Sequence, residues 1–434
     1  MEKPNVAVVT YAKPIESLQK AIRLADGFNN LKKNDRVLIK PNALTWDNKH
    51  HIPPYGVFTS TRLVEDLVIA LKEFGCTDIF IGEGAVQLNE DAPTSIGVME
   101  NLGYGALVAK YGVKLIDLND GPFEKVKLAD DLTLFISEPA LKADFLIDIP
   151  AMKTHSQTKV SLGMKNLKGC LKMASRRLCH HKDLDLDYCV SLIPEKLTPK
   201  LTIVDGIYVL EKGPIHTGNA YRADLIAVST DIFAADVVAT ALMGLDPAEI
   251  GHLSRYAKRH GRSLSYRDFA MKGEDVETVK KPVKWDWNWN EANTGPTIFE
   301  RMGITGVAIP KYDETLCTGC SPIVNMSNIF IISANKGKPF GNFEVLSGKR
   351  MLARPGYDKT LLLGNCIIAA NKNNPNIKEA IELKGCPPSV EDLKKVLTDL
   401  GVEFVEGAYD YYLNQLATKY DGKEEYDKGL YTSA

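Results

Sequence analysis

The sequence predicts an α/β fold with a mostly parallel sheet and helices on both faces, plus a smaller C-terminal cysteine-rich α+β region. Short apolar runs alternate with amphipathic helical segments through residues 5–120, and the pattern continues to about residue 261. The last third of the chain instead holds four spaced cysteines. Strand–helix alternation is typical of a parallel sheet, because the crossover helices cover its two faces.

The first part of the chain shows this alternation most clearly. Short apolar runs between turn residues predict buried strands. Residues 61–75 have apolar side chains at helical spacing and end at a glycine, as helices commonly do. The predicted strands are residues 5–12, 35–42, 78–85 and 113–120, and the predicted helices are residues 16–28, 61–75 and 98–112.

The middle of the chain continues in the same way. Asp246, Pro247 and Glu249 predict a helix start, since Asp caps a helix, Pro fits its first position and Glu reaches back to the cap. That helix is expected to end at residues 260–261. The other predicted elements are strands at residues 143–155, 201–210 and 223–230 and a helix at residues 231–244.

A change of composition after residue 261 divides the chain into three predicted regions. Residues 1–261 form the α/β ligand-binding domain, and residues 262–302 are a polar linker or excursion. The aromatic run at 285–290 is interpreted as one face of a strand. Residues 303–434 are expected to bind a metal cluster and to pack on the first domain. The elements predicted there are strands at 306–310 and 329–334 and a helix at 389–401.

Composition and charge exclude several classes of protein. The 434 residues have a net charge of −2 and no strongly basic block, so a nucleic-acid binder is not expected. No stretch approaches about 18 apolar residues, and no charged leader precedes an apolar run, so we expect neither a membrane span nor a signal peptide. We therefore expect a cytoplasmic protein whose eight cysteines are reduced thiols or metal ligands.

Four cysteines near the C-terminus are the strongest functional signal. Cys317 and Cys320 form a Cys-x-x-Cys pair, and Cys366 and Cys386 follow at a distance. The short turn places two thiolates on the same side, and two distant thiolates complete a set of four sulfur ligands. Proline follows Cys386, as it follows one ligand of bacterial ferredoxins. We interpret the four as ligands of one 4Fe–4S cluster.

Other interpretations of these cysteines stay open. Zinc also takes four thiolates, although its usual pattern is two Cys-x-x-Cys pairs. A thioredoxin-like redox pair would stand at the start of a helix, whereas residues 321–331 look strand-like. Free thiols are the remaining interpretation.

A second group of thiols and imidazoles lies in the middle of the chain. Its members are Cys170, Cys179, His180, His181 and Cys189. Their spacing matches no common metal motif, and free cysteines are commonly small buried apolar residues. Whether this group binds a second metal stays open, and His180 or His181 is also a candidate for contacting a ligand or moving a proton.

Polar residues at the predicted strand ends indicate a ligand site, since ligands of open α/β sheets bind beyond the carboxyl ends of the strands. Lysines and amides there suit an anionic small molecule, and the start of the helix at 61–75 also suits an anion. Lone lysines and amides at strand ends are, however, often solvated loop residues. The candidates for binding the molecule or cofactor are Lys40, Asn42, Glu83, Lys153 and Asn166. The catalytic candidates are His155, Lys165 and Asp205, of which His155 or Asp205 would transfer protons.

Several stretches resemble the uncharacterised family called domain of unknown function 362, often labelled iron–sulfur centre proteins. Two motifs, KTH…KNLKG and VDG…GP, are specific in combination. The matching stretches are residues 37–42, 63–84, 146–169, 201–214 and 231–247, with the ending around Cys366 and Cys386.

The resemblance implies a cytosolic α/β protein, common in anaerobes and often carrying iron–sulfur clusters, with no assigned reaction. Some relatives carry an added ferredoxin module that this chain lacks, so at most one cluster is expected. A strand followed by His, Gly and Lys is also similar to nickel-pincer lactate racemases, but their several spaced histidines are absent.

The preferred hypothesis is an oxidoreductase that passes electrons between the 4Fe–4S cluster and the anionic small molecule. The first alternative is an electron-transfer or maturation protein without its own substrate, which docks to a redox partner protein. The second is a non-redox transferase or isomerase with a structural metal, such as zinc, held by the four cysteines. A homodimer is compatible with each, and no nucleic-acid or membrane partner is expected.

Overall fold

The computed structural model describes residues 3–86, 92–213, 215–285 and 289–432, which form two compact units. The first unit contains residues 1–176, 187–285 and 418–434, and the second contains residues 177–186 and 286–417. The second unit therefore interrupts the first. No helix in the described part of the chain is long and apolar enough to cross a bilayer.

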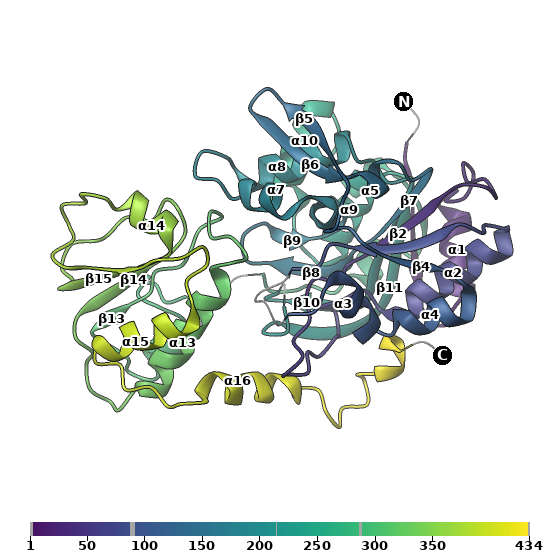
Figure 1. The fold of residues 1–434 in the computed structure, drawn as a ribbon. Coiled ribbons are helices and arrows are strands. Elements are labelled where there is room, and N and C mark those ends of the chain that lie inside the picture. Colours follow the sequence, from purple (N-terminus) through teal and green to yellow (C-terminus); the bar gives the residue numbers. More distant parts are fainter. Residues whose placement is uncertain (1–2, 87–91, 214, 286–288, 433–434) are drawn as a thin grey trace. The chain divides into compact units, whose positions relative to one another are not determined.

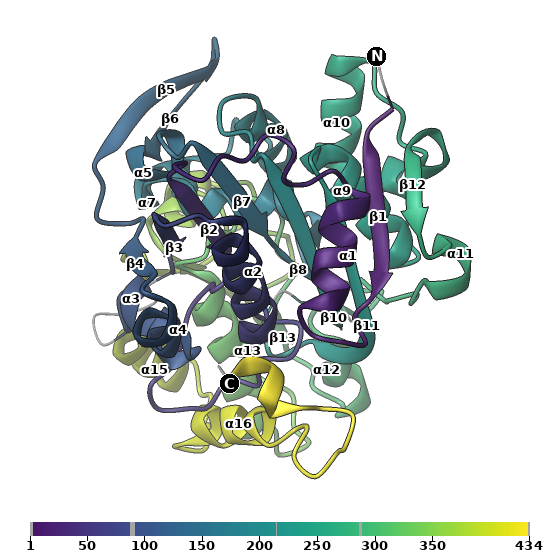
Figure 2. The same cartoon turned by 90° about the vertical axis from the view of Figure 1, so that its right-hand side faces the viewer.

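A ten-stranded sheet forms the centre of the first unit (Figures 1 and 2). Its main order is β12-β1-β11-β10-β7-β2-β3-β4, with β8 and β9 attached beside β10. The run β10-β7-β2-β3-β4 is parallel throughout, whereas β11 is antiparallel to its neighbours β10 and β1. These strands are β1 (Asn5–Thr10), β2 (Val37–Pro41), β3 (Ile79–Glu83), β4 (Lys114–Asp117), β7 (Phe145–Ile149), β8 (Ala151–His155), β9 (Lys159–Ser161), β10 (Leu201–Glu211), β11 (Asn219–Ser229) and β12 (Ala270–Gly273).

Helices cover both faces of this sheet, which confirms the predicted α/β fold (Figure 2). The helices α1 (Glu16–Leu24) and α2 (Thr61–Phe74) share one core cluster with Ala7 and Val9 of β1. The helix α9 (Ile232–Leu242) also packs on β1 and β11 but contributes nothing to that cluster. Successive strand side chains point to opposite faces, so β1 supplies apolar residues to both layers.

Several elements of the first unit differ from prediction. The helix expected at 98–112 is split into α3 (Ser95–Asn101) and α4 (Tyr104–Tyr111), because Gly103 adopts a left-handed φ of 84°. Asp246 caps only a short 3-10 turn, and the helix α10 (Gly251–His260) begins after it. The hairpin of β5 (Phe123–Ala129) and β6 (Leu132–Ser137) was not predicted.

The strand order contains a topological switch point between β2 and β7. From β2 the chain proceeds to β3 and β4 on one side, and it later returns to β7 and β10 on the other side. Ligands of open α/β sheets bind at the carboxyl ends of the strands at such a point.

The second unit is built on a sheet of four parallel strands in sequential order, β13 (Val307–Ala308), β14 (Phe343–Leu346), β15 (Lys359–Leu363) and β16 (Ala380–Leu383). Its helices include α13 (Ser321–Ala334), α14 (Asn365–Ala370) and α15 (Val390–Asp399). Strands and helices alternate, so this region is α/β rather than the expected α+β.

The prediction of a strand at 329–334 was wrong, as was the strand-like interpretation of 321–331, because residues 321–334 form α13. Ile323, Val324, Phe330 and Ile331 are buried, and their spacing places them on one helical face. The β-branched residues in this run hid that period. Cys320 consequently precedes a helix, so the argument used against a thioredoxin-like pair does not hold.

The predicted domain boundaries also differ from the observed division. Residues 270–273 form β12, which pairs with β1, so residues 262–285 belong to the first unit. Residues 418–434 return to the first unit as well. Of the aromatic run at 285–290, residues 286–288 lie outside the described residues, and Trp289 donates its indole N–H to Ile309 O at 2.8 Å.

Candidate functional site

A buried polar network lies at the carboxyl ends of the strands that flank the switch point. Lys40 of β2 is 1% exposed and donates its Nζ to Glu83 of β3, at 2.9 Å from Oε2. The same Nζ donates to Asn166 Oδ1 at 3.0 Å. Glu83 also accepts the backbone N–H groups of Ala43 and Gly84, both at 2.8 Å. This buried ion pair is thus hydrogen-bonded on both sides, as a desolvated pair requires.

A second lysine and two amides extend the network. Asn42 donates its Nδ2 to Asn166 Oδ1 at 3.1 Å, and Lys153 Nζ donates to Asn42 Oδ1 at 2.5 Å and to Val57 O at 2.6 Å. Burial lowers the pKa of Lys153 to about 7. The structure therefore brings together all the residues predicted to bind a cofactor, although the cations among them already have protein partners.

Two glycines in the short helical turns that follow β9 allow this close packing. A β-carbon on Gly169 would lie 2.3 Å from Glu83 Oε1 and 2.7 Å from Lys40 Nζ. A β-carbon on Gly163 would lie 2.9 Å from carboxylate oxygens of both Asp148 and Asp236. A larger residue at either glycine of the LGMKNLKG segment would collide with side chains of the network, so glycine is needed at both positions.

Two carboxylates of this network were missed in the sequence. Asp148 of β7 accepts a hydrogen bond from Asn166 Nδ2 at 2.8 Å. Asp236 of α9 accepts the backbone N–H groups of Gly163 at 2.7 Å and Met164 at 2.8 Å. Both are fully buried in otherwise apolar elements. A lone acid inside an apolar run was the signal that could have identified them, because a buried charge needs specific partners.

The predicted catalytic residues lie in different surroundings. Asp205 of β10 accepts the backbone N–H and the hydroxyl of Ser60, at 2.6 and 2.8 Å. Burial raises the pKa of Asp205, and the Ser60 donors oppose that effect. His155 ends β8 and accepts the Gln157 N–H on Nδ1 at 3.1 Å, while Lys165 is half-buried on the short helix α6 (Gly163–Asn166).

The protein's own carboxylates thus occupy the positions that an anionic ligand would use. Asp205 sits at the start of α2, where an external anion was expected, and Asp236 sits at the start of α6. Glu83 pairs with Lys40. The anionic small molecule remains a prediction, and these residues would have to exchange partners to bind it.

The four predicted metal-binding cysteines lie in the second unit, at the carboxyl ends of its strands. Cys317 and Cys320 lie between β13 and α13, Cys366 follows β15, and Cys386 follows β16. The loop after β14 supplies Lys349. Since parallel strands present their carboxyl ends at one edge, cysteines far apart in the sequence share one side of the sheet.

Hydrogen bonds join the loops that carry these cysteines. The Asn365 N–H donates to Gly385 O at 3.1 Å, and the Gly385 N–H donates to Asn365 Oδ1 at 2.9 Å. These residues directly precede Cys366 and Cys386. A β-carbon on Gly364, which has a φ of 99°, would lie 3.4 Å from Cys320 Sγ. The absent side chain therefore leaves space beside the thiols.

The thiols influence one another's ionisation. The hydrogen bond from Cys320 lowers the pKa of Cys317 to about 5, and it raises the pKa of Cys320. Negative charge on Cys317, Cys386 and Cys366 also raises the pKa of Cys320. Cys366 and Cys386 are exposed. Within the described ranges, no three Cys, His, Asp or Glu side chains already have the spacing of a metal site.

The donor set nevertheless suits a sulfur-ligated metal centre. Four thiols without a disulfide supply the ligand type that such centres use, and the lowered pKa of Cys317 and the absent side chain at Gly364 are compatible with one. The second group of thiols and imidazoles is divided between the units: Cys170 and Cys189 belong to the first, and Cys179, His180 and His181 to the second.

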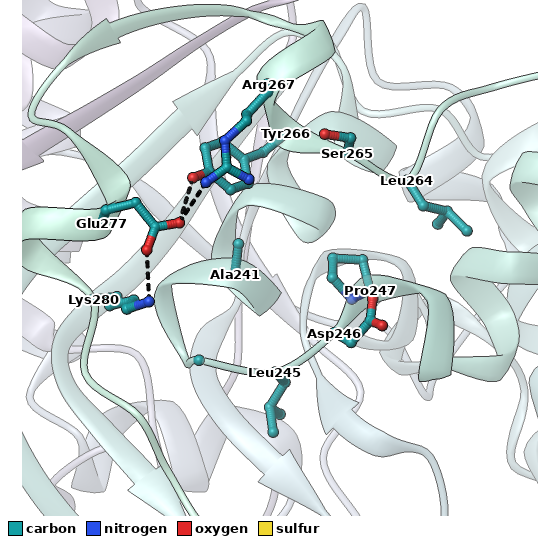
Figure 3. Close-up of a pocket in the computed structure, with 11 residues that line it drawn as sticks. Ala241, Leu245, Asp246, Pro247, Leu264, Ser265, Tyr266, Arg267, Glu277 and Lys280 are labelled. Carbon is teal, nitrogen blue, oxygen red and sulfur yellow. Dashed lines mark hydrogen bonds and ion pairs between the residues drawn. The ribbon is translucent and has the colours of Figure 1, made fainter.

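Two cavities lie apart from the polar network. One of about 500 Å³ lies beside the end of α9 in the first unit (Figure 3). There Glu277 accepts hydrogen bonds from Tyr266, Arg267 and Lys280 at 2.6–2.8 Å. Another of about 640 Å³ lies beside α14 and includes Asn365. The lining of the first cavity includes none of the predicted site residues.

Comparison with known proteins gives a family. Residues 37–241 match the family described as "Domain of unknown function (DUF362)". The chain is 31% identical to the thylakoid-associated protein sll1697 of Synechocystis sp. over 249 residues, which are 54% of this chain and 72% of that protein. The lactate racemase apoprotein of Thermoanaerobacterium thermosaccharolyticum aligns with a TM-score of 0.37 and 13% identity, over 55% of this chain and 57% of the racemase chain. The identity to the Synechocystis protein and the match around the switch point together show that this chain belongs to the domain of unknown function 362 family.

Proposed function

We propose that this protein is an iron–sulfur redox protein in which Cys317, Cys320, Cys366 and Cys386 hold one 4Fe–4S cluster. The observation that supports this proposal is the location of the thiols. They lie on three segments that follow strands of one parallel sheet, at the same edge of that sheet. A cluster bound there would supply one-electron chemistry. The eight free thiols support a reducing compartment, for which we propose the cytoplasm.

The residues around the thiols have defined tasks in this proposal. Asn365 and Gly385 hold two of the cysteine loops together, and Gly364 leaves room beside Cys320. Lys349 lowers the pKa of Cys317 and opposes the effect of burial on Cys366. A positive charge beside thiolates favours their ionised, ligating form.

Electron transfer to a partner protein has more support than a reaction within this chain. Cys366 and Cys386 are exposed, which allows a partner to approach. Lys40 and Lys153, in contrast, are each 1% exposed and already paired. The oxidoreductase hypothesis requires the network to open, whereas the electron-transfer hypothesis does not.

The test is anaerobic purification followed by iron, sulfide and zinc analysis, with a visible spectrum before and after dithionite. About four iron and four sulfide per chain and a broad band that bleaches are expected. Cys366→Ser and Cys386→Ser should lose most of the iron, whereas Cys76→Ser, at a buried thiol of the first unit, should retain it. Zinc without a visible band would refute the redox proposal and support a structural metal.

A further inference from the structure

The four-stranded sheet of the second unit is covered unequally on its two faces (Figure 1). On one face, Ile381 and Leu383 of β16 pack in a large core cluster with residues of α13 and α15. On the other face, Leu346 and Leu362 belong to a small cluster with residues of α14 and its neighbouring loops. Parallel sheets are normally buried on both faces, so a thinly covered face calls for an explanation.

A hollow of about 640 Å³ lies on the thinly covered face, beside α14. One side of the hollow is formed by Ala380 and Glu382 of β16, which alternate along the strand and so point to the same face, and by Lys384 directly after it. All three are exposed, and β16 is an edge strand of the sheet. The other side is formed by α14 and the loop that follows it. The hollow is therefore accessible to a partner molecule.

The hollow adjoins two of the proposed cluster ligands. Asn365, which lines the hollow, directly precedes Cys366, and Lys384 stands two residues before Cys386. Both cysteines are exposed. A molecule seated in the hollow would therefore contact the two segments that carry these thiols.

Positive charge dominates the lining of the hollow, which includes three lysines and one acidic residue. Lys378 pairs with Asp358 at 2.8 Å, whereas Lys384 Nζ is 3.7 Å from Glu382, near the limit for an ion pair. Lys372 is exposed and has no ion pair within the described ranges. On the opposite face, α15 carries three acidic residues and two lysines. This distribution directs an acidic partner to the hollow and away from α15.

Hydrogen bonds fix the loop that carries Lys372. Asn371 accepts the Ala353 N–H and donates to Met351 O, both at 2.9 Å, and Asn374 donates to Asn371 Oδ1 at 3.0 Å. Leu352, between the two residues bonded to Asn371, is 59% exposed. An apolar contact beside a charged rim is typical of protein interfaces, and a surface fixed beforehand costs little ordering on binding.

We propose that the hollow beside α14 is the docking surface for a small acidic electron-transfer protein. This inference rests on the proposed iron–sulfur function and names the kind of partner that exchanges electrons at the cysteines. In that exchange the partner's reduced centre loses one electron, which the cluster accepts, and no covalent bond forms or breaks. Lys372 and Lys384 pair with carboxylates of the partner, and Leu352 supplies an apolar contact.

The test is isothermal titration calorimetry of the full-length protein at low salt with two acidic probes, a plant-type ferredoxin and a flavodoxin. At least one should bind, with an affinity that falls as salt is added. Lys372→Glu should weaken binding by about 5-fold or more, because it reverses a charge at the contact. The control Lys395→Glu makes the same charge change at an exposed position of α15 and should alter the affinity by less than about 2-fold.

Three results would overturn the docking surface. The first is no binding of either probe, and the second is equal weakening by Lys372→Glu and Lys395→Glu, which would show only a general attraction of charge. The third is a dimer of the protein alone that Lys372→Glu dissociates, which would assign the hollow to a second copy of the chain.

Iron, sulfide and zinc analysis of the same samples separates this inference from the proposed function. Normal cluster content without binding would refute the docking surface alone. Binding that Lys372→Glu weakens, in a protein that holds zinc and has no visible band, would sustain the docking surface and refute the redox function.

Discussion

The buried Lys40–Glu83 ion pair depends on close packing by its neighbours. Both side chains are almost fully buried, and Gly169 packs directly against them. A buried ion pair is stable only while its remaining hydrogen bonds are made. The absence of a side chain at Gly169 is therefore as necessary for this ion pair as its two charges are.

Gly169→Ala should destabilise the protein by about 1–3 kcal/mol, the usual cost of overpacking, because the new methyl group would collide with the ion pair. Urea unfolding gives the free energy. The control is Gly105→Ala in α4, where the nearest heavy atom would lie at 3.8 Å. An equal loss in both variants would contradict the steric explanation.

Lys153 should make stability depend on pH. Its pKa of about 7 in the folded state lies below the unfolded value, so between these values the unfolded chain binds a proton that the folded chain does not. Stability from this group therefore rises with pH above about 7, by up to ~1.4 kcal/mol per pH unit.

Lys153→Met removes that titration. The difference in unfolding free energy between wild type and variant, measured at several pH values from 7 to 10, should grow in favour of the wild type. Other groups titrate equally in both proteins and cancel. A difference that stays constant across this range would show that Lys153 has an ordinary pKa.

At the scale of elements, the strand-end loops of the second unit decide how the thiols are held. Each loop follows a strand of the same parallel sheet, so the sheet fixes where the loops begin. The reciprocal bonds between Asn365 and Gly385 then fix two of the loops to each other. Groups that orient metal ligands in this way commonly matter nearly as much as the ligands.

Asn365→Ala should weaken metal retention by about 10-fold or more, measured as the rate of iron or zinc loss to a chelator. The matched control is Asn376→Ala, which also removes an amide hydrogen bond within the second unit, to Ala353 O at 2.9 Å. Equal retention by the two variants would show that the Asn365–Gly385 bonds do not support the site.

At the scale of the whole molecule, the chain leaves the first unit and returns to it. The returning residues 418–434 place Tyr420, Tyr426 and Tyr431 around Tyr55 of the first unit, with ring centroids 5.0–5.5 Å from it. Aromatic contacts of this kind add stability beyond their buried area. The second unit is therefore an insertion in the chain of the first, and the residues that follow this insertion pack within the first unit.

Calorimetry should resolve two unfolding transitions, one for each unit. If the four cysteines hold a metal as proposed, its removal should lower the transition of the second unit by about 5 °C or more and leave the other in place, since a ligand stabilises only the part that binds it. The Cys386→Ser variant identifies the transition of the second unit. A single transition, or equal shifts of both, would contradict independent units.

The α/β class, most strands and helices of the first unit, and the strand-end residues that meet at the switch point could be predicted from the residue pattern alone. Local apolar periodicity and the common edge of parallel strands are enough for these conclusions. The thiol set and its proposed metal were also suggested by residue type and spacing alone.

The pairing of the buried polar groups, in contrast, could be recognised only in the folded protein. Asp148 and Asp236 are remote in sequence, and nothing local shows that both lie beside Gly163. The same holds for the hydrogen bond that pairs Lys40 with Glu83, and for the helix α13, whose helical spacing of apolar residues was masked by β-branched residues. The physical reason is that burial and pairing energies depend on neighbours in space, which a local sequence pattern does not specify.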